Sequence, residues 1–317
     1  MRAYKKWTST FFNDEGLPFI SFFDLQGEIL TKQGAYRVPI TAVNHRKDSM
    51  GVVIYNKYGG DVIPYINSKK VQELLLQSLE NVFIDEIDST ESIDNVKVQS
   101  DALLDEERSS KLEYEIPKLV VNYLDTPAVN TFYKCEVVDI VYGAVPMPEF
   151  GCIISLGSGL EEEHLPVTGE IIYLHYWTNI HENEVFTNSV SGTPRLVREG
   201  ESRHEAIEEG SSKKKFINGA LPRTAIGYNK DKTKLFLVAV PTGRKQDGTT
   251  GASLQQLADI MDYIGCYEAQ NLDGGGSTNM VVGGVNVINP AGSRRISVAV
   301  GAIELKEQNI KKLPRKR

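Results

Sequence analysis

The sequence predicts an α+β fold with a mixed β-sheet core and a few helices. Residues 7–66 alternate apolar and polar positions between Gly, Pro and Asn turn signals, which is typical of strands. The same pattern returns from Ile116 to Tyr142. Helical periodicity is evident at Val71–Phe83 and Ser253–Gly265. The second of these segments lies between two predicted strands, which is the arrangement of a crossover unit.

Length and composition favour a single domain over residues 1–317. A chain of 317 residues with 41% hydrophobic content can bury one large core or two modest ones. The formal net charge of −7 argues against nucleic acid or an anionic membrane as the main partner. The basic C-terminal stretch 306–317 is expected to be a solvated tail.

The cysteines and the apolar runs exclude further classes of protein. Cys135, Cys152 and Cys266 are widely spaced, which argues against a disulfide framework or a metal knuckle and predicts buried free thiols. No apolar run approaches the length of a membrane-spanning helix, and no signal peptide opens the chain. Either a cytoplasmic location or earlier removal of a leader fits these observations. The oligomeric state is left open.

The N-terminal segment is predicted to form strands separated by polar turns. Its elements are a strand at Trp7–Phe12, a turn at Asn13–Gly16, a strand ending at Asn44 and a strand at Gly51–Asn56. Asn44, His45 and Arg46 lie together at a strand end. Residues of this kind at a strand end are more often exposed to solvent than functional, but binding and catalytic residues occur in loops more often than elsewhere. Asn44 and Arg46 are therefore candidate substrate-binding residues.

The middle of the chain combines a polar insertion with further strands. Residues 84–115 have few aromatics and a strong negative excess, which predicts an acidic surface insertion. Strands are expected at Gly151–Leu156 and Gly169–Tyr176, and a loop at Glu201–Lys215. The histidines in this part fit no metal-ligand spacing, so they are expected to be structural or solvated: His164, His175 and His181.

The C-terminal third has the clearest pattern. The expected elements are strands at Thr224–Tyr228 and Lys234–Val240, a helix over Ser253–Gly265, a strand at Cys266–Leu272, a strand pair around Gly283-Gly284 and a closing strand at Arg295–Leu305. Ser253 followed by Gln256 is a capping box, and Gly265 suits the position after the helix. This arrangement places Asp273 at the C-terminal end of a strand, where ligands tend to bind in open α/β sheets.

The stretch NLDGGGSTNM, Asn271–Met280, is the candidate site. Three consecutive glycines allow positive φ and close approach of a ligand to bare backbone. Successive N–H groups in such a turn can form an anion-binding concavity. Asp273 at its rim could bind sugar hydroxyls, hold a cation or take part in acid–base chemistry. The alternative is a tight turn, for which Asp-Gly is a common signal. The loop is not a P-loop, and it is expected to join strands without presenting a helix N-terminus.

Several motifs in this order resemble the phosphodiester glycosidase family. They are SGTPRLVREG (191–200), PRTAIG (222–227), LFLVAV, LQQLADIM and NLDGGGS, with a looser match at Phe11-Phe12. The resemblance covers Ser189–Leu305 firmly and Thr10–Gly60 more loosely. Two departures stand out. After the LFLVAV strand, many members carry an acidic residue in Asp-Gly-Arg or Asp-Gly-Gln, whereas this chain has PTGR at Pro241–Arg244. Before Phe11-Phe12, the family's Gly-Gly pair is Ser9-Thr10 here.

The resemblance implies a phosphodiester-glycosidase-like catalytic domain that hydrolyses the glycosidic bond of a sugar-1-phosphodiester. Asp273 is then the expected nucleophile, base or oxocarbenium stabiliser. Arg223 is expected to pair with the phosphodiester as a planar fork, with further donors from the amides of Gly274, Gly275 and Gly276. Further expected substrate contacts are Thr224, Arg244, Ser277 and Thr278, with Arg294 or Arg295 as additional possibilities. Relatives of this kind favour an exported or envelope location.

Several alternatives stay open at this point. Glycosidases usually pair two carboxylates, and the second is not identified among Asp14, Asp48, Glu182, Glu184 and Glu268. No cofactor is required by the motifs, although Asp273 and backbone carbonyls could hold Ca²⁺ or Mg²⁺. The chain could instead be an inactive glycan-binding module. It could also be a phosphodiesterase or a sequestering protein for a nucleotide-type ligand, in which case aromatic rings (Trp177, Phe186 or Tyr228) should stack over the pocket.

Overall fold

The computed structural model confirms the α+β class, because strands dominate and helices are few. It describes residues 7–45, 51–63, 115–157, 162–241, 251–288, 296 and 298–303. The predicted helix at 71–83, nearly all of the predicted insertion at 84–115 and the tail at 306–317 lie outside the described residues.

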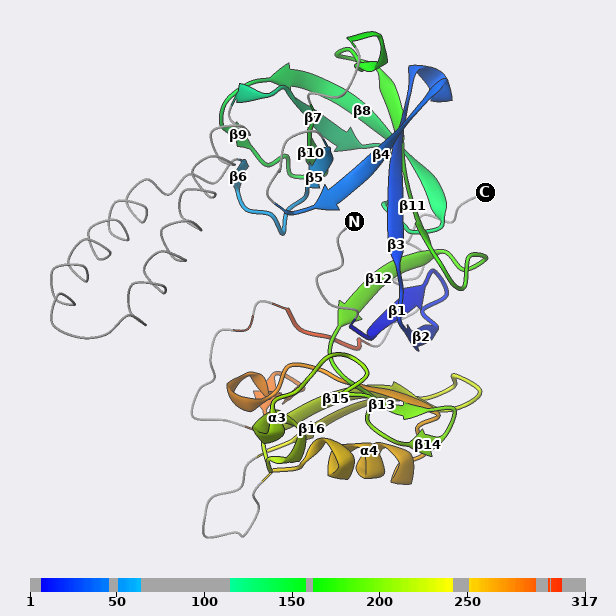
Figure 1. The fold of residues 1–317 in the computed structure, drawn as a ribbon, viewed down its shortest axis with the longest axis vertical. Helices are drawn as coiled ribbons and strands as arrows, with labels where there is room; N and C mark the ends of the chain where they lie inside the picture. Colours follow the sequence, from blue (N-terminus) through cyan, green and yellow to red (C-terminus); the bar gives the residue numbers. More distant parts are fainter. Residues whose placement is uncertain are drawn as a thin grey trace, which may run out of the picture. The chain divides into compact units, whose positions relative to one another are not determined.

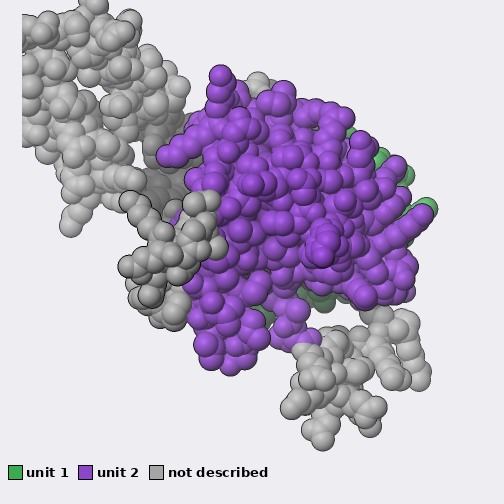
Figure 2. All heavy atoms as spheres, turned by 90° about the horizontal axis from the view of Figure 1, so that it is seen from below, with its two compact units in different colours: residues 1–4, 23–187 green, residues 5–22, 188–317 purple. Residues whose placement is uncertain are grey.

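The chain divides into two compact units, which Figure 2 shows in different colours. Unit 1 contains Met1–Tyr4 and Phe23–Thr187, and unit 2 contains Lys5–Phe22 and Asn188–Arg317. The sequence predicts one domain over the same range. Whether the two units together make one domain stays a prediction.

Unit 1 is built around a closed barrel (Figure 1). Its strands, in barrel order, are β10 (Gly151–Ser155), β5 (Val52–Tyr55), β4 (Tyr36–Val43), β3 (Leu25–Thr31), β11 (Ile171–Thr178), β8 (Thr131–Val141) and β7 (Lys118–Tyr123). Neighbouring strands are antiparallel except β4 and β5. A short pair, β6 (Val62–Ile63) and β9 (Val145–Pro146), completes the unit's described strands.

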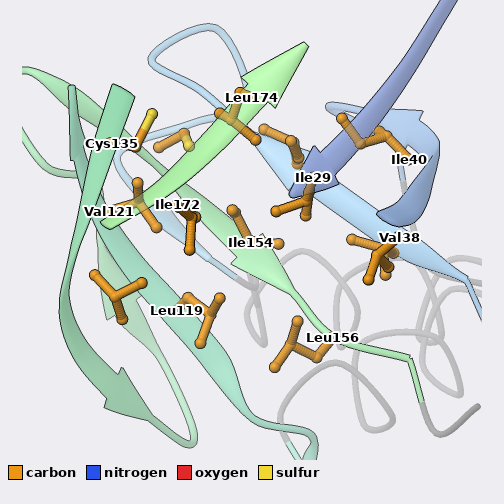
Figure 3. Close-up of a cluster of buried hydrophobic side chains, with 14 of the residues drawn as sticks. Ile29, Val38, Ile40, Leu119, Val121, Cys135, Ile154, Leu156, Ile172 and Leu174 are labelled. Atoms are coloured by element: carbon orange, nitrogen blue, oxygen red, sulfur yellow. The ribbon is translucent and has the colours of Figure 1, made fainter. Parts of the chain in front are cut away.

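The barrel core follows from the alternation of side chains along each strand. Ile29, Leu119, Ile154 and Leu174 are among the inward residues that fill it (Figure 3). Cys135 and Cys152 are free and buried, as is Cys266 in unit 2, which confirms the expectation for all three thiols. Burial raises the pKa of Cys152 to about 12, so that thiol stays protonated at neutral pH.

Unit 2 contains two larger sheets and one hairpin, except that the first two residues of β12 belong to unit 1. A three-stranded sheet has the order β12 (Phe186–Ser191), β1 (Ser9–Asn13) and β2 (Pro18–Ser21). A five-stranded sheet has the order β14 (Glu201–Ser202), β13 (Arg195–Arg198), β17 (Glu268–Asn271), β15 (Arg223–Tyr228) and β16 (Leu235–Val240). The hairpin pairs β18 (Val281–Val282) with β19 (Val285–Asn286), and Gly283 and Gly284 have positive φ in its turn, as predicted.

The predicted crossover helix is α4 (Leu254–Tyr263). Ser253 and Gln256 form the expected capping box, and Gly265 has φ +96° just beyond the helix. Leu257 and Met261 belong to the apolar face that packs on the five-stranded sheet (Figure 1). Because β16 and β17 are both antiparallel to the intervening β15, α4 connects two parallel strands.

Two expectations differ from the structure. The predicted loop at Glu201–Lys215 contains β14 and the start of a short helix, α3 (Lys214–Asn218). The predicted closing strand at Arg295–Leu305 is wrong over its described residues, which form no strand. Val298 is 60% exposed and Ile303 84% exposed, so these apolar side chains lack the cover that a paired strand would provide.

Candidate active site at the Asp273–Thr278 loop

The glycine-rich loop leaves β17 and is hydrogen bonded to the segments beside it. The N–H of Asn271 donates to the carbonyl of Pro194, and the N–H of Leu272 donates to that of Thr224, each at 2.8 Å. The N–H of Gly275 donates to the carbonyl of Pro222 at 2.9 Å. These bonds fix the loop against Pro194, which directly precedes β13, and against the start of β15.

The glycines are explained by close approach and by backbone angle. A Cβ on Gly274 would lie 2.7 Å from the carbonyl oxygen of Pro222, which leaves no room for a side chain. Gly275 has φ +60°, a conformation that disfavours other residues. It begins a short 3₁₀ turn at Gly275–Ser277, where the sequence indicated only a strand connection. The sequence predicted that a ligand approaches the glycine backbone closely, whereas in the structure the Pro222 carbonyl does so at Gly274.

Most amides of the loop already have acceptors. The N–H of Gly274 donates to Oδ1 of Asp273 at 3.0 Å, and that of Gly275 is bound to Pro222. The amides of Ser277 and Thr278 are bound within the 3₁₀ turn. Of the three glycine amides predicted to receive a phosphate, Gly276 alone has no acceptor within the described part of the chain. A ligand could recruit the other two only by displacing these bonds.

Arg223 lies in a different environment from the one the sequence suggested. It is 2% exposed on β15, on the same sheet face as Ala225, which packs in the α4 core. Its Nε donates to the carbonyl of Ala252 at 2.9 Å, and its Nη2 donates to the carbonyls of Phe216 at 2.6 Å and Gly219 at 3.1 Å. The expected guanidinium facing a phosphodiester is thus held by backbone carbonyls, because strand alternation turns it toward the helices.

Burial lowers the pKa of Arg223, but the guanidinium remains charged because its pKa starts so high. Its plane also lies over the ring of Phe216, with 5.3 Å between the guanidinium carbon and the ring centroid. The cation therefore links the end of α3, the segment before α4 and the start of β15. Pro222, which accepts the Gly275 amide, precedes it directly.

A group of buried oxygens without partners surrounds the same loop. Six buried side-chain oxygens in the described part of the chain lack a hydrogen-bond partner, and five belong to Thr193, Thr224, Asn271, Thr278 and Asn279. Asn271 is 3% exposed and Thr278 is 7% exposed. An unsatisfied buried polar group costs about 1–3 kcal/mol, so such a concentration indicates a place for a polar ligand or water.

These residues come together through close backbone packing. A Cβ on Gly192 would lie 2.2 Å from the carbonyl oxygen of Asn271, so residue 192 must be glycine. The side-chain amide of Asn271 donates to the carbonyl of Thr193 at 2.6 Å, leaving its Oδ1 unpartnered. Sequence reasoning selected Thr224 and Thr278 but missed Thr193, Asn271 and Asn279. Thr193 and Asn271 were available as members of the SGTP and NLDGGGS motifs.

The candidates for a second carboxylate have other bonds or other locations. Glu268 forms a buried ion pair with Arg195, with Nε 2.9 Å from Oε2. Asp14 is exposed in the turn after β1, and Asp48 lies outside the described residues. Glu182 and Glu184 belong to unit 1, whereas Asp273 belongs to unit 2. No bond that the structure describes brings any of these carboxylates to Asp273, which is itself exposed.

The remaining predicted site residues belong to unit 1 or lie outside the described residues. Asn44 lies in unit 1, where its side chain donates to Oδ1 of Asn56 at 2.7 Å and accepts from the Asn56 amide at 2.9 Å. Arg46 and Arg244 lie outside the described residues, as do Arg294 and Arg295. Over the described ranges, no three His, Cys, Asp or Glu side chains gather into a metal site, and no helix is long and apolar enough to cross a membrane.

Comparison with known proteins confirms the resemblance. The model of the phosphodiester glycosidase family matches residues 157–303, a range that includes the whole loop cluster. N-acetylglucosamine-1-phosphodiester alpha-N-acetylglucosaminidase of Mus musculus is 28% identical over 156 residues, covering 44% of this chain and 29% of that protein. The Bos taurus protein of the same name is 27% identical over 164 residues, covering 48% and 29%. The match thus spans less than a third of each relative's length.

A solved structure supports the fold. A hypothetical protein from Synechocystis superposes with a TM-score of 0.52 at 19% identity, covering 89% of this chain and 42% of that one. At this identity the likeness concerns architecture alone. Residues 157–303 are thus similar in sequence to the phosphodiester glycosidase family.

Proposed function

We propose that this protein hydrolyses the glycosidic bond of a sugar-1-phosphodiester on a glycan or glycoconjugate, with Asp273 at the reacting centre. The observation that carries the proposal is the group of unpartnered buried oxygens beside the Asp273 loop. A sugar offers many hydroxyls at short spacing, and each can donate to an Asn Oδ1 or either donate to or accept from a Thr hydroxyl. The match of residues 157–303 to the family supplies the reaction class.

Asp273 is suited to act at the anomeric carbon. Its Oδ1 accepts the Gly274 amide, a bond that fixes the orientation of the carboxylate, while the side chain stays exposed to an incoming substrate. The carboxylate would serve as nucleophile, as base toward water or as stabiliser of an oxocarbenium ion. In the overall reaction the C1–O bond breaks, water supplies the new hydroxyl at C1, and the phosphomonoester departs. Such a leaving group needs little protonation.

The phosphate would bind at the backbone of Gly274–Gly276. The unpaired amide of Gly276 is the donor best placed to meet it, and Ser277 follows directly in the same turn. We assign Arg223 a positioning role in this scheme, because its bonds to three carbonyls hold the start of β15 under the loop. Asn271, Thr278, Thr193 and Thr224 would then bind the sugar.

The sequence is also compatible with two other functions. A glycan-binding module without activity is favoured by one observation: no described bond brings a second carboxylate to Asp273. For a nucleotide-type ligand, two of the three rings expected to stack are buried, because Tyr228 is 6% exposed and Phe186 is 1% exposed, whereas Trp177 is half-buried in unit 1. The hydrolase and the binding module differ in turnover, which a direct assay measures.

The test is Asp273→Asn assayed with N-acetylglucosamine α-1-phosphate esterified to a small alcohol. Asparagine keeps the oxygen that accepts the Gly274 amide but cannot carry the negative charge. We expect turnover to fall by about 10²–10⁴-fold, the range typical of a lost acid–base group. Asp262→Asn, an exposed aspartate on α4, is the matched control and should retain full activity.

The free energy of unfolding shows whether a loss of turnover in the Asp273 variant comes from the reaction or from misfolding. Asp273 is exposed, so its substitution should change the free energy of unfolding by no more than about 0.5 kcal/mol. If the wild type binds sugar phosphodiesters across a substrate panel but releases no sugar from any of them, the binding module is correct and the hydrolase is not. Equal turnover by the wild type and the variant would remove Asp273 from the reaction.

A further inference from the structure

A row of stacked rings lies on the outer face of the unit 1 barrel. Phe132 on β8 is directly opposite His175 on β11, and Trp177 follows two residues later on the same face. The rings of Phe132 and His175 stack with centroids 4.0 Å apart, and those of His175 and Trp177 stack at 5.0 Å. Their planes differ by 23° and 29°. We call these three residues the ring stack.

Polar side chains border the ring stack on the neighbouring strands. Glu28 on β3 lies directly across from His175, with its Oε1 3.2 Å from His175 Nδ1. The same oxygen accepts from Nη1 of Arg37 on β4 at 2.7 Å. The Arg37 side chain is 62% exposed, so most of its donors face water. Gln26 lies across from Trp177 and is also exposed. Aromatic faces and planar hydrogen-bonding groups are thus adjacent.

This face is fixed before any ligand arrives. The side chain of Asn130, at the start of β8, donates to Thr178 Oγ1 and to the carbonyls of His181 and Glu184. Its Oδ1 accepts from the Thr178 amide. These bonds hold the end of β11 against the start of β8, where the rings stack. Phe132 nevertheless remains 46% exposed, because only one of its faces packs on His175. A rigid, exposed aromatic face lowers the entropic cost of binding.

We infer that the ring stack and its polar border bind an uncharged oligosaccharide. The C–H face of a pyranose packs on an exposed aromatic ring, while its hydroxyls bond to carboxylate, amide and guanidinium groups such as those of Glu28, Gln26 and Arg37. The border is electrically balanced, because Arg37 and Lys134 are matched by Glu28 and Glu136 on the same face. Single-stranded nucleic acid also stacks on aromatic rings, but it requires a positively charged groove. Closed and partly open β-barrels bind ligands of both kinds on their strand faces.

This proposal stands apart from the proposed hydrolysis. The ring stack belongs to unit 1 and the Asp273 loop to unit 2, and no residue is shared. The family match at 157–303 includes His175 and Trp177 but excludes Phe132, Glu28 and Arg37. A saccharide-binding surface in unit 1 could therefore exist whether or not the loop is catalytic.

The experiment uses the intrinsic fluorescence of Trp177 in the full chain. The chain has two tryptophans, so Trp7→Phe leaves Trp177 as the sole indole. Cellotetraose and chitotetraose are the probes, and each is titrated while Trp177 emission is followed. We expect a saturable emission shift with at least one of them. Phe132→Ala should weaken that binding about tenfold through loss of the stacked face, whereas Phe132→Tyr should preserve it.

Controls distinguish the ring stack from other surfaces. Phe150→Ala removes a ring that is 71% exposed elsewhere in unit 1 and should leave binding unchanged. Arg37→Ala tests the polar border with little risk to folding and should also weaken binding. Asp273→Asn should bind as tightly as the wild type, so a failed hydrolase assay does not affect this result.

Three outcomes would overturn the inference. The first is no emission shift with either tetrasaccharide. The second is binding that survives both Phe132→Ala and Arg37→Ala. The third is tighter binding of an oligothymidylate of similar length, which would identify the face as a nucleic-acid surface.

Discussion

Arg223 carries a positive charge in a setting that is almost closed to water, and three backbone carbonyls replace the hydration it loses. A buried charge is tolerated only when such partners compensate its desolvation. The carbonyls come from two segments of unit 2: Phe216 and Gly219 belong to α3 and its C-terminal cap, and Ala252 precedes α4. The Arg223 side chain therefore stabilises, through these hydrogen bonds, the region that supports the Asp273 loop.

Substituting Arg223 separates a positioning role from direct phosphate binding. Arg223→Met leaves three carbonyls without their donor, and we expect the free energy of unfolding to fall by about 3 kcal/mol. Urea unfolding measures this change. Arg223→Lys keeps the charge but not the planar fork, so it should recover only part of the stability.

Kinetics provide the second readout for Arg223. A positioning residue should lower kcat and leave KM nearly unchanged for Arg223→Lys, because the phosphate keeps its contacts in the ground state. A large rise in KM with normal stability would instead show that the guanidinium contacts substrate. That result would restore the role first expected from the sequence.

In the glycine-rich loop, two adjacent positions require glycine for different reasons. Gly274 is required by contact, since a Cβ would lie 2.7 Å from the Pro222 oxygen. Gly275 is required by angle alone, since φ is +60° and nothing lies near its Cβ position. The first glycine is therefore required by a steric contact and the second by its backbone angle, and alanine substitutions at the two positions should have different effects on activity.

We expect Gly274→Ala and Gly275→Ala to cost about 1–2 kcal/mol each in unfolding free energy, for clash and for backbone strain respectively. Gly274→Ala should also reduce turnover well below that of Gly275→Ala, because relieving the clash pushes the loop away from Pro222. Unfolding and turnover measured on both variants test this difference. Equal loss of activity would show that the Gly275–Pro222 bond does not position the loop.

At the scale of the whole molecule, charge and organisation are the main features. The chain has a formal net charge of −7 and divides into a barrel unit and a unit with the five-stranded sheet. The candidate active site lies within unit 2, whereas the ring stack lies within unit 1. Each unit has its own apolar cluster, which explains how one chain supports two separate surfaces.

The net charge predicts the salt dependence of the proposed hydrolysis. An anionic phosphodiester approaches a protein of net charge −7, so screening should favour encounter. We expect kcat/KM to rise about two- to threefold between low and physiological ionic strength. An uncharged aryl glycoside of the same sugar is the control and should show no such rise. A fall in kcat/KM with salt would show that a local positive potential dominates the site.

Local patterns in the sequence were enough to predict the class of fold, the crossover helix with its capping box, the hairpin at Gly283-Gly284 and the position of Asp273 just after a strand. These features depend on local periodicity, turn chemistry and residue order, all of which are present in a linear sequence. The resemblance to the phosphodiester glycosidases also came from ordered motifs and was confirmed over residues 157–303.

Three features required the three-dimensional structure: the direction of the Arg223 side chain, the loop amides that have no acceptor and the buried oxygens that have no partner. Arginine at the start of a strand can face either side of a sheet, and the packing of α4 on one face settles the choice. Asn271 and Thr193 meet because β17 and the segment before β13 are adjacent in space. Such pairings join residues far apart in sequence, and no local pattern encodes them.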